Sequence, residues 1–233
     1  MIKIKINDYS IVASQIENSL LFIVQQLKLL VSMTPIARIM FLLFFPACLG
    51  ILAQAIYGEK LTHQLVAMGM FVFCIEQSRM AVKDLELVKY AKKQVKDTRV
   101  NIFYQITIIT IITELLGFYL SSLWLGWGSI LILLSQVWFN LFANIRINIV
   151  DKVNQLDKVV VKSWAISERS PVLIADFTGL LLVSLWMLNI ASLWISWGLF
   201  SMVIVYCSIK LTIFSLQVIE ENFQVSSSKD ASG

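Results

Sequence analysis

The sequence predicts an all-α, polytopic membrane protein, and three observations lead to this fold class. First, 58% of the 233 residues are hydrophobic and only 15% are charged, against roughly 25% charged residues in an ordinary soluble domain. Second, the apolar residues fall into six long blocks, most of them near the ~20 residues that a helix needs to cross ~30 Å of hydrocarbon. Third, the positive charges lie almost entirely on one side of the spans that these blocks define. We therefore expect six transmembrane helices in a single integral membrane domain, residues 1–233.

The second expected span is the weakest, because its continuous apolar stretch covers only Leu65–Ile75. On its own, the segment 61–80 could be a re-entrant or interfacial segment. We count it as a span because the topology closes only if this segment crosses the membrane. The six expected spans are Pro35–Tyr57, Leu61–Met80, Val100–Ser122, Trp127–Arg146, Val172–Ile190 and Trp194–Leu216.

The positive charges predict the orientation. Of the 19 Lys and Arg residues, 18 fall on the side of the termini and the long connections, and only Lys60 lies in a turn on the other side. The positive-inside rule then places both termini on the cytoplasmic side of a bacterial inner membrane or of an organellar or thylakoid-type membrane. The net charge of +4 reflects this bias, so we expect no nucleic-acid partner.

One string of the sequence occurs twice, seventy residues apart. "SLWLGWG" at Ser122–Gly128 and "SLWISWG" at Ser192–Gly198 agree at five of seven positions. Each falls in the expected outer turn of a helical hairpin, where its last glycine can relax the turn. The first hairpin carries an aromatic residue before a glycine at the matching place, so we expect three repeated hairpins, either with a functional pseudo-symmetry or as a duplication that keeps only a packing pattern. Their turns would carry an aromatic belt of Tyr57, Trp124, Trp127, Trp194 and Trp197.

An amphipathic helix is expected before each hairpin, because apolar residues recur there at spacings of three and four. The third apolar face runs through Val153, Leu156, Val160 and Trp164. No Gly or Pro interrupts Ser129–Ser170, so the fourth span could run directly into this third helix. The expected order is an amphipathic helix at 1–33, hairpin 34–80, amphipathic helix 81–98, hairpin 99–146, amphipathic helix 147–169, hairpin 170–218 and a disordered tail at 219–233.

Three pairs of residues indicate where the odd-numbered spans begin. Thr34-Pro35, Thr98-Arg99 and Ser170-Pro171 each precede or open such a span. Ser or Thr as the N-cap, with Pro at the first helical position, is typical of a helix start.

Polar residues inside the expected spans are the candidate functional residues, because such groups are costly in hydrocarbon. With the second hairpin folded about residue 125, Glu114 and Gln136 lie at equal depth, ~16 Å below the turn. Thr110 then faces Asn140, and Gln136, Asn140 and Asn144 recur every four residues along one face. This intramembrane polar cluster fits either a hydrogen-bonded clamp between helices or a proton or cation site.

Two ion pairs are also expected. Asp176 and Lys210 would lie at equal depth in the third hairpin, ~25 Å from its turn, where a salt bridge would close the hairpin. Glu76 and Arg79 are one helical turn apart at the inner end of the second span, which suits a local ion pair.

No pattern of residues indicates a metal site, a cofactor or a catalytic centre. The three cysteines, Cys48, Cys74 and Cys207, lie in separate apolar runs, where isolated cysteines behave as small apolar residues. His63 is the only histidine and has no adjacent Cys or carboxylate to complete a metal site.

The function that these features favour is non-catalytic. We expect a scaffold, assembly factor or accessory subunit of a larger membrane complex, whose partners are the lipid bilayer and other integral membrane proteins or further copies of itself. The alternative is a small transporter or channel for a proton, cation or small solute, with Glu114, Gln136 and Asn140 along its path. Membrane shaping and an intramembrane enzyme are less favoured.

Overall fold

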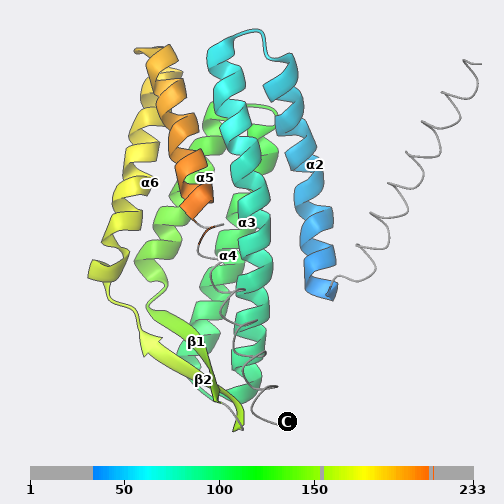
Figure 1. Cartoon of the computed structure of the whole chain (residues 1–233), viewed down its shortest axis with the longest axis vertical. Helices are drawn as coiled ribbons and strands as arrows, with labels where there is room; N and C mark the ends of the chain where they lie inside the picture. Colours follow the sequence, from blue (N-terminus) through cyan, green and yellow to red (C-terminus); the bar gives the residue numbers. More distant parts are fainter. Residues whose placement is uncertain (1–33, 153–154, 210–211, 213–233) are drawn as a thin grey trace, which may run out of the picture. The chain divides into compact units, whose positions relative to one another are not determined.

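The computed structural model describes residues 34–152, 155–209 and 212 of the chain (Figure 1). The chain divides into two compact units, Met1–Ile39 and Met40–Gly233. Of the first unit the description covers only Thr34–Ile39, the start of the first described helix. The predictions for residues 1–33, for Lys210 and for the tail 219–233 lie outside the described residues.

Six described helices are long and apolar enough to cross a membrane. The expectation of an integral, multi-pass membrane protein is thereby confirmed, and such a chain contacts the lipid bilayer. The segment 61–80 belongs to a helix of 34 residues, which at 1.5 Å per residue is far longer than a re-entrant segment needs. The six helices are α2 (Pro35–Tyr57), α3 (Leu61–Gln94), α4 (Thr98–Ser121), α5 (Leu125–Phe142), α6 (Ile166–Met187) and a sixth, Ser192–Ile209.

The helix starts follow local capping chemistry, with two corrections. The hydroxyl of Thr34 accepts a hydrogen bond from the amide of Ala37 at 3.2 Å, which confirms the start of α2. The cap of α4 is Asp97 rather than Thr98, because its carboxylate accepts from the Arg99 amide at 2.9 Å and carboxylates are strong N-caps.

The α6 start is the second correction, because the helix begins at Ile166, before the expected Ser170-Pro171 pair. Pro171 therefore lies inside the helix, where it cannot donate a hydrogen bond to the carbonyl of Ser167. The hydroxyl of Ser170 donates to that carbonyl instead, at 2.8 Å. This local substitution lets the helix run through the proline.

The helix expected over residues 147–169 is wrong, because a β-hairpin occupies this place. Strand β1 (Ile145–Lys152) pairs antiparallel with β2 (Gln155–Ser163), with Ile145 opposite Ser163. β1 is rich in isoleucine and β2 in valine, and β-branched residues favour strands over helices. The apolar residues of β1 also alternate with a period of two, as a half-buried strand requires. The fourth span consequently ends at Phe142 and does not continue into a surface helix.

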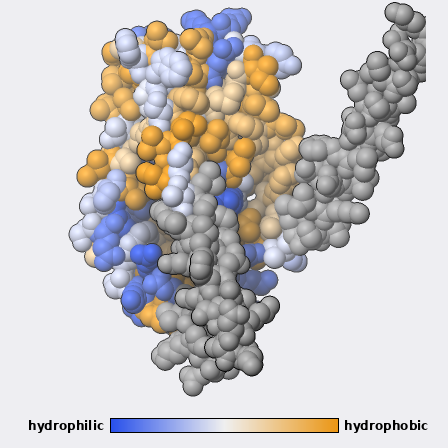
Figure 2. All heavy atoms as spheres, in the orientation of Figure 1, coloured by the Kyte–Doolittle hydropathy of each residue, from blue (hydrophilic) through white to orange (hydrophobic). Residues whose placement is uncertain are grey.

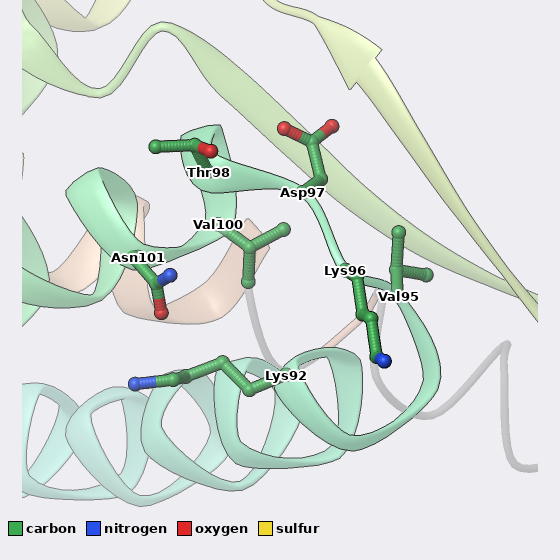
Figure 3. Close-up of a pocket in the computed structure, with 7 residues that line it drawn as sticks. All are labelled: Lys92, Val95, Lys96, Asp97, Thr98, Val100 and Asn101. Carbon is green, nitrogen blue, oxygen red and sulfur yellow. The ribbon is translucent and has the colours of Figure 1, made fainter.

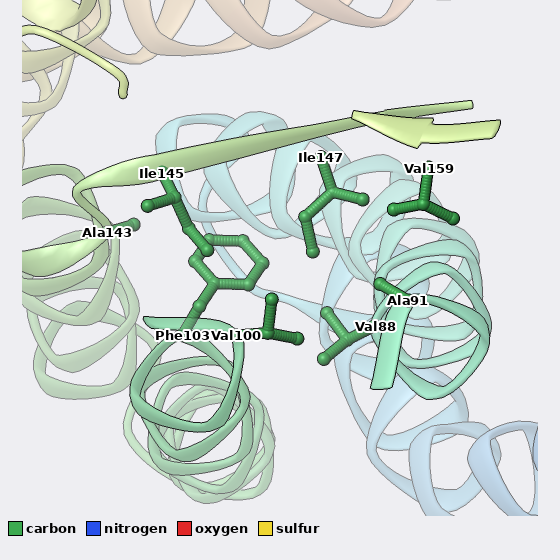
Figure 4. Packing of buried hydrophobic residues seen from close by; sticks show 8 residues of the cluster. All are labelled: Val88, Ala91, Val100, Phe103, Ala143, Ile145, Ile147 and Val159. Carbon is green, nitrogen blue, oxygen red and sulfur yellow. The ribbon is translucent and has the colours of Figure 1, made fainter. Parts of the chain in front are cut away.

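The β-hairpin covers the lower ends of α3 and α4 and builds a buried cluster with them (Figure 4). Ile145 and Ile147 of β1 point toward Val88 of α3 and Phe103 of α4. The second expected amphipathic segment, 81–98, is thus largely the continuation of α3 up to Gln94. Its buried apolar face packs on protein, so this face does not lie on a lipid surface.

Hydrophobic residues gather over the middle of the helices on the face shown in Figure 2, and hydrophilic residues gather near the β-hairpin. We call this end of the Met40–Gly233 unit, with the α3–α4 turn and the β-hairpin, the basic end. Its described cations include Lys89, Lys92, Lys93, Lys96, Arg99, Arg146 and Lys162.

Candidate functional site

Glu114 on α4 and Gln136 on α5 meet inside the helix bundle. Glu114 is only 3% exposed, and its Oε1 accepts a hydrogen bond from the Gln136 Nε2. The same Nε2 lies 3.4 Å from the Oε1 of Gln77 on α3. The helices α3, α4 and α5 therefore share this polar contact, whereas the sequence predicts a contact between only the two helices that carry Glu114 and Gln136.

Glycines allow α4 and α5 to approach closely enough for this contact. A Cβ atom on Gly128 would collide with the backbone nitrogen of Ser121 and the carbonyl oxygen of Gly117. A Cβ atom on Gly117 would in turn press on the side chain of Ile132. Small residues at a helix–helix interface let the two backbones approach in this way.

Asn140 carries the polar contacts from α5 to α6. Its Nδ2 donates to the carbonyl oxygen of Gln136 at 3.0 Å and to the Oδ2 of Asp176 at 3.1 Å. Both Asn140 and Asp176 are buried. The expected partner of Asp176, Lys210, lies outside the described residues, so that salt bridge stays a prediction.

Arg169 on α6 is the member of the site that sequence reasoning missed. It is 1% exposed, and its Nη1 donates to the carbonyl oxygens of Asn140 and, at 2.9 Å, of Ala143. Its Nη2 donates to the carbonyl oxygen of Trp164 at 3.0 Å, and its guanidinium lies 5.3 Å from the Trp164 ring centroid. The last carbonyls of a helix lack partners within that helix and favour a cation. Arg169 thus joins the end of α5, the end of β2 and the start of α6.

A signal for Arg169 was present in the sequence. It stands seven residues before Asp176, two helical turns away, so both residues lie on one face of α6. This shared face places Arg169 in line with a residue of the expected ion pair, Asp176.

Thr110 and Asn144 do not bond within the intramembrane polar cluster. The Thr110 hydroxyl is buried and has no hydrogen-bond partner within the described part of the chain, so it does not bond to Asn140. Asn144 lies beyond the end of α5 and leaves the four-residue spacing. Its carbonyl oxygen accepts from the Trp164 amide at 2.9 Å and its Oδ1 lies 3.4 Å from the Arg169 Nη2. It therefore belongs to the contacts around Arg169.

The expected pair of Glu76 and Arg79 on α3 is confirmed. The buried Glu76 carboxylate accepts from the Nη2 and the Nε of Arg79, at 2.8 and 3.0 Å. Tyr206 of the sixth helix lies beside Glu76 and Gln77 and packs its ring against Phe73. The polar groups thus reach from the sixth helix through α3 to α4, α5 and α6.

The expected aromatic belt lies at the ends of the helices. Tyr57 ends α2, Trp124 precedes α5 and Trp194 falls in the first turn of the sixth helix. All five belt side chains are exposed. This placement suits the membrane surface, where aromatic rings are enriched.

We call the bonded set of Glu114, Gln136, Asn140, Asp176 and Arg169 the polar network. It can hold the three helices α4, α5 and α6 in register, or it can offer carboxyl groups to a proton or cation. Among the described residues no three His, Cys, Asp or Glu side chains come together in a way that could hold a metal ion. Comparisons with protein-family models, curated proteins and solved structures found no match to the chain. The function is therefore inferred from the geometry of the polar network.

Proposed function

We propose that the chain is a non-catalytic membrane scaffold, assembly factor or accessory subunit of a larger membrane complex. One observation carries this proposal: the deep polar side chains bond to other helices of the same chain. Glu114 accepts from Gln136, Asn140 donates to Asp176, and Arg169 donates to backbone carbonyls. Bonds of this kind fix the rotation and depth of packed helices. A transport site, in contrast, must exchange its partners for solute and water.

The outer helices support a role in assembly. In the most apolar 18-residue segment of α4, 44% is buried within the chain. The corresponding buried share is 22% in α6 and 11% in the sixth helix. Large apolar side chains such as Leu181 on α6 and Val205 on the sixth helix are mostly exposed. In a bilayer this surface contacts lipid or the helices of a partner. We propose that part of it contacts partner helices.

The test is extraction of the protein from its own membrane in a mild detergent, followed by native electrophoresis and mass spectrometry of the band. We expect co-migration with unrelated membrane subunits at a fixed ratio. Migration of the chain alone, or only with further copies of itself, would contradict the role in a larger complex.

The second candidate function is a small transporter or channel, and one observation favours it. Three carboxyl groups, those of Glu76, Glu114 and Asp176, are buried in one bundle, and intramembrane acids often mark proton or cation paths. Glu114→Gln keeps the size of the side chain but removes its charge. In a transporter reconstituted in liposomes this change abolishes flux, whereas in a scaffold the complex survives it.

A matched control for that variant lies one residue earlier on α4. Thr113 donates its hydroxyl to the carbonyl oxygen of Ile109 in its own helix, at 2.9 Å, and is not part of the polar network. Thr113→Val should therefore change neither flux nor assembly. Equal effects of both variants would show that the assay reports on α4 in general rather than on Glu114.

A further inference from the structure

A polar pocket of about 300 Å³ lies at the turn between α3 and α4 (Figure 3). Lys92 lines it from the end of α3, Lys96 from the turn, and Thr98 and Asn101 from the start of α4. Its volume is at the lower end of the range of small-molecule sites, which suits a head group rather than a large ligand. It belongs to the basic end and has no part in the polar network.

The pocket is positively charged. Lys92 lies in the last turn of α3 and Lys96 in the extended turn that follows it, and neither forms an ion pair with a carboxylate of the described residues. The Lys92 Nζ lies 4.3 Å from the centroid of the Tyr104 ring. This cation–π contact positions the ammonium group without neutralising it.

Asp97 also lines the pocket, but its carboxylate does not cancel the charge of the two lysines. The Asp97 Oδ2 accepts from the Arg99 Nη2 at 2.8 Å, and in Figure 3 the carboxylate points to the side of the turn opposite Lys92 and Lys96. The hydrogen bonds from Arg99 hold the pKa of Asp97 below its ordinary value. Asp97 therefore stays ionised and paired with Arg99, while the charges of the two lysines stay available.

We propose that this pocket binds the phosphate of an anionic phospholipid head group. The two ammonium groups, the Asn101 amide and the positive end of the α4 dipole all favour a phosphate. Basic pockets between transmembrane helices are typical sites for such head groups. The proposal does not depend on whether the chain is a scaffold or a transporter.

A lipid fits better than free phosphate because an apolar stripe leaves the pocket along α4. Ile102 follows Asn101 directly and is 54% exposed, and Ile109, Ile112 and Leu116 are exposed at spacings of seven, three and four. Such spacings place all four side chains on one face of the helix. This face offers acyl chains a surface that starts at the head-group pocket, whereas free phosphate would gain nothing from it.

The experiment uses the full chain purified in detergent and titrated with phosphatidylglycerol or phosphatidylcholine, with the bound lipids counted by native mass spectrometry. Lys92→Gln/Lys96→Gln should bind phosphatidylglycerol roughly 30-fold more weakly than the wild type, since each interfacial lysine contributes about fivefold. Its binding of phosphatidylcholine should not change. Lys92→Arg/Lys96→Arg should restore the binding of phosphatidylglycerol.

The matched control is Lys89→Gln/Lys93→Gln. It removes the same amount of charge close by, at two exposed residues of α3 that do not line the pocket, and it should bind phosphatidylglycerol like the wild type. An equal loss in both double variants would show a diffuse basic surface and would overturn the site. So would unchanged binding in Lys92→Gln/Lys96→Gln. Displacement of phosphatidylglycerol by excess inorganic phosphate would assign the pocket to a soluble anion and overturn the lipid.

Discussion

The two copies of the repeated string lie in hairpins that pack very differently. Gly128, which closes the first copy, touches Ser121 and Gly117 so closely that no side chain fits, whereas a Cβ atom added to Gly198, which closes the second, meets no atom of the described residues within 4 Å. The buried share of the apolar segment is 44% in α4 and 39% in α5, but only 22% in α6 and 11% in the sixth helix. The same seven-residue pattern thus accompanies a tight interface once and an open surface once.

The two copies also occupy different positions relative to their helices. In the first copy Ser122–Trp124 forms the turn, and α5 starts at Leu125. In the second copy Ser192 is already the first residue of the sixth helix, and the turn before it uses Asn189 and Ala191 at positive φ. No described glycine has a positive φ, so the expectation that these glycines relax the turns is wrong. A repeated string therefore does not ensure a repeated local structure.

The largest effect should come from adding one methyl group to each copy. Gly128→Ala would force α4 and α5 apart, because the added Cβ meets backbone atoms that cannot rotate away; we expect a loss of about 3 kcal/mol. Gly198→Ala meets nothing and should be neutral or stabilising by up to ~1 kcal/mol through helix propensity. Thermal unfolding of both variants in one detergent measures the difference. Similar melting temperatures would remove the distinction between the two hairpins.

The next effect concerns Arg169, which joins the two hairpins. Arg169→Met keeps much of the side-chain volume but leaves the carbonyls of Ala143 and Trp164 without their donor. We expect a loss of about 2–3 kcal/mol, the usual cost of buried groups that lose a charged partner. Unfolding in denaturant measures the loss. Arg146→Met is the control, since Arg146 is exposed on β1, and an equal loss there would show that net charge rather than the buried contacts determines stability.

The hydrogen bond of Glu114 and Gln136 within the tight hairpin should contribute less. In a double-mutant cycle of Glu114→Leu and Gln136→Leu we expect a coupling free energy of about 1 kcal/mol, as for other hydrogen bonds between membrane helices. The matched cycle of Glu114→Leu and Thr113→Val should give a coupling near zero, because Thr113 bonds within its own helix. A coupling as large as that of the first pair would contradict a specific contact at Gln136.

Local composition was sufficient to predict the helices, while contacts between distant segments explain what was missed. Each span is an apolar run of helical length, so its existence depends only on its own residues. The depth of Glu114 and Gln136 followed from folding one hairpin about its turn. The position of Arg169 on the face of Asp176 can be predicted from the sequence, but its bonding partners cannot, because they are backbone carbonyls of α5. The β-hairpin was missed because its valines also recur at helical spacings, and β-branching decided against a helix.

The hairpin of α2 and α3 is a third hairpin to compare with the other two. A covalent link between two of its side chains is the smallest change to the protein among these tests. The thiols of Cys48 and Cys74, far apart in the sequence, lie close to one another across these two helices, although the sequence predicts three isolated cysteines. Iodine, a membrane-permeant oxidant, should therefore join the two thiols as a disulfide within one chain, with release of iodide and protons, and should change the melting temperature by no more than a few degrees.

The linkage can be read by mass spectrometry after proteolysis, from a peptide pair that spans Cys48 and Cys74. Cys207 on the sixth helix is the control, because the contact across the hairpin pairs Cys74 with Cys48 alone. A product that joins Cys207 to Cys74 as readily would mean that α2 and α3 do not hold their register. Since the apolar segment of α2 is 22% buried, like that of α6, α2 would then be held as loosely as the hairpin of α6 and the sixth helix.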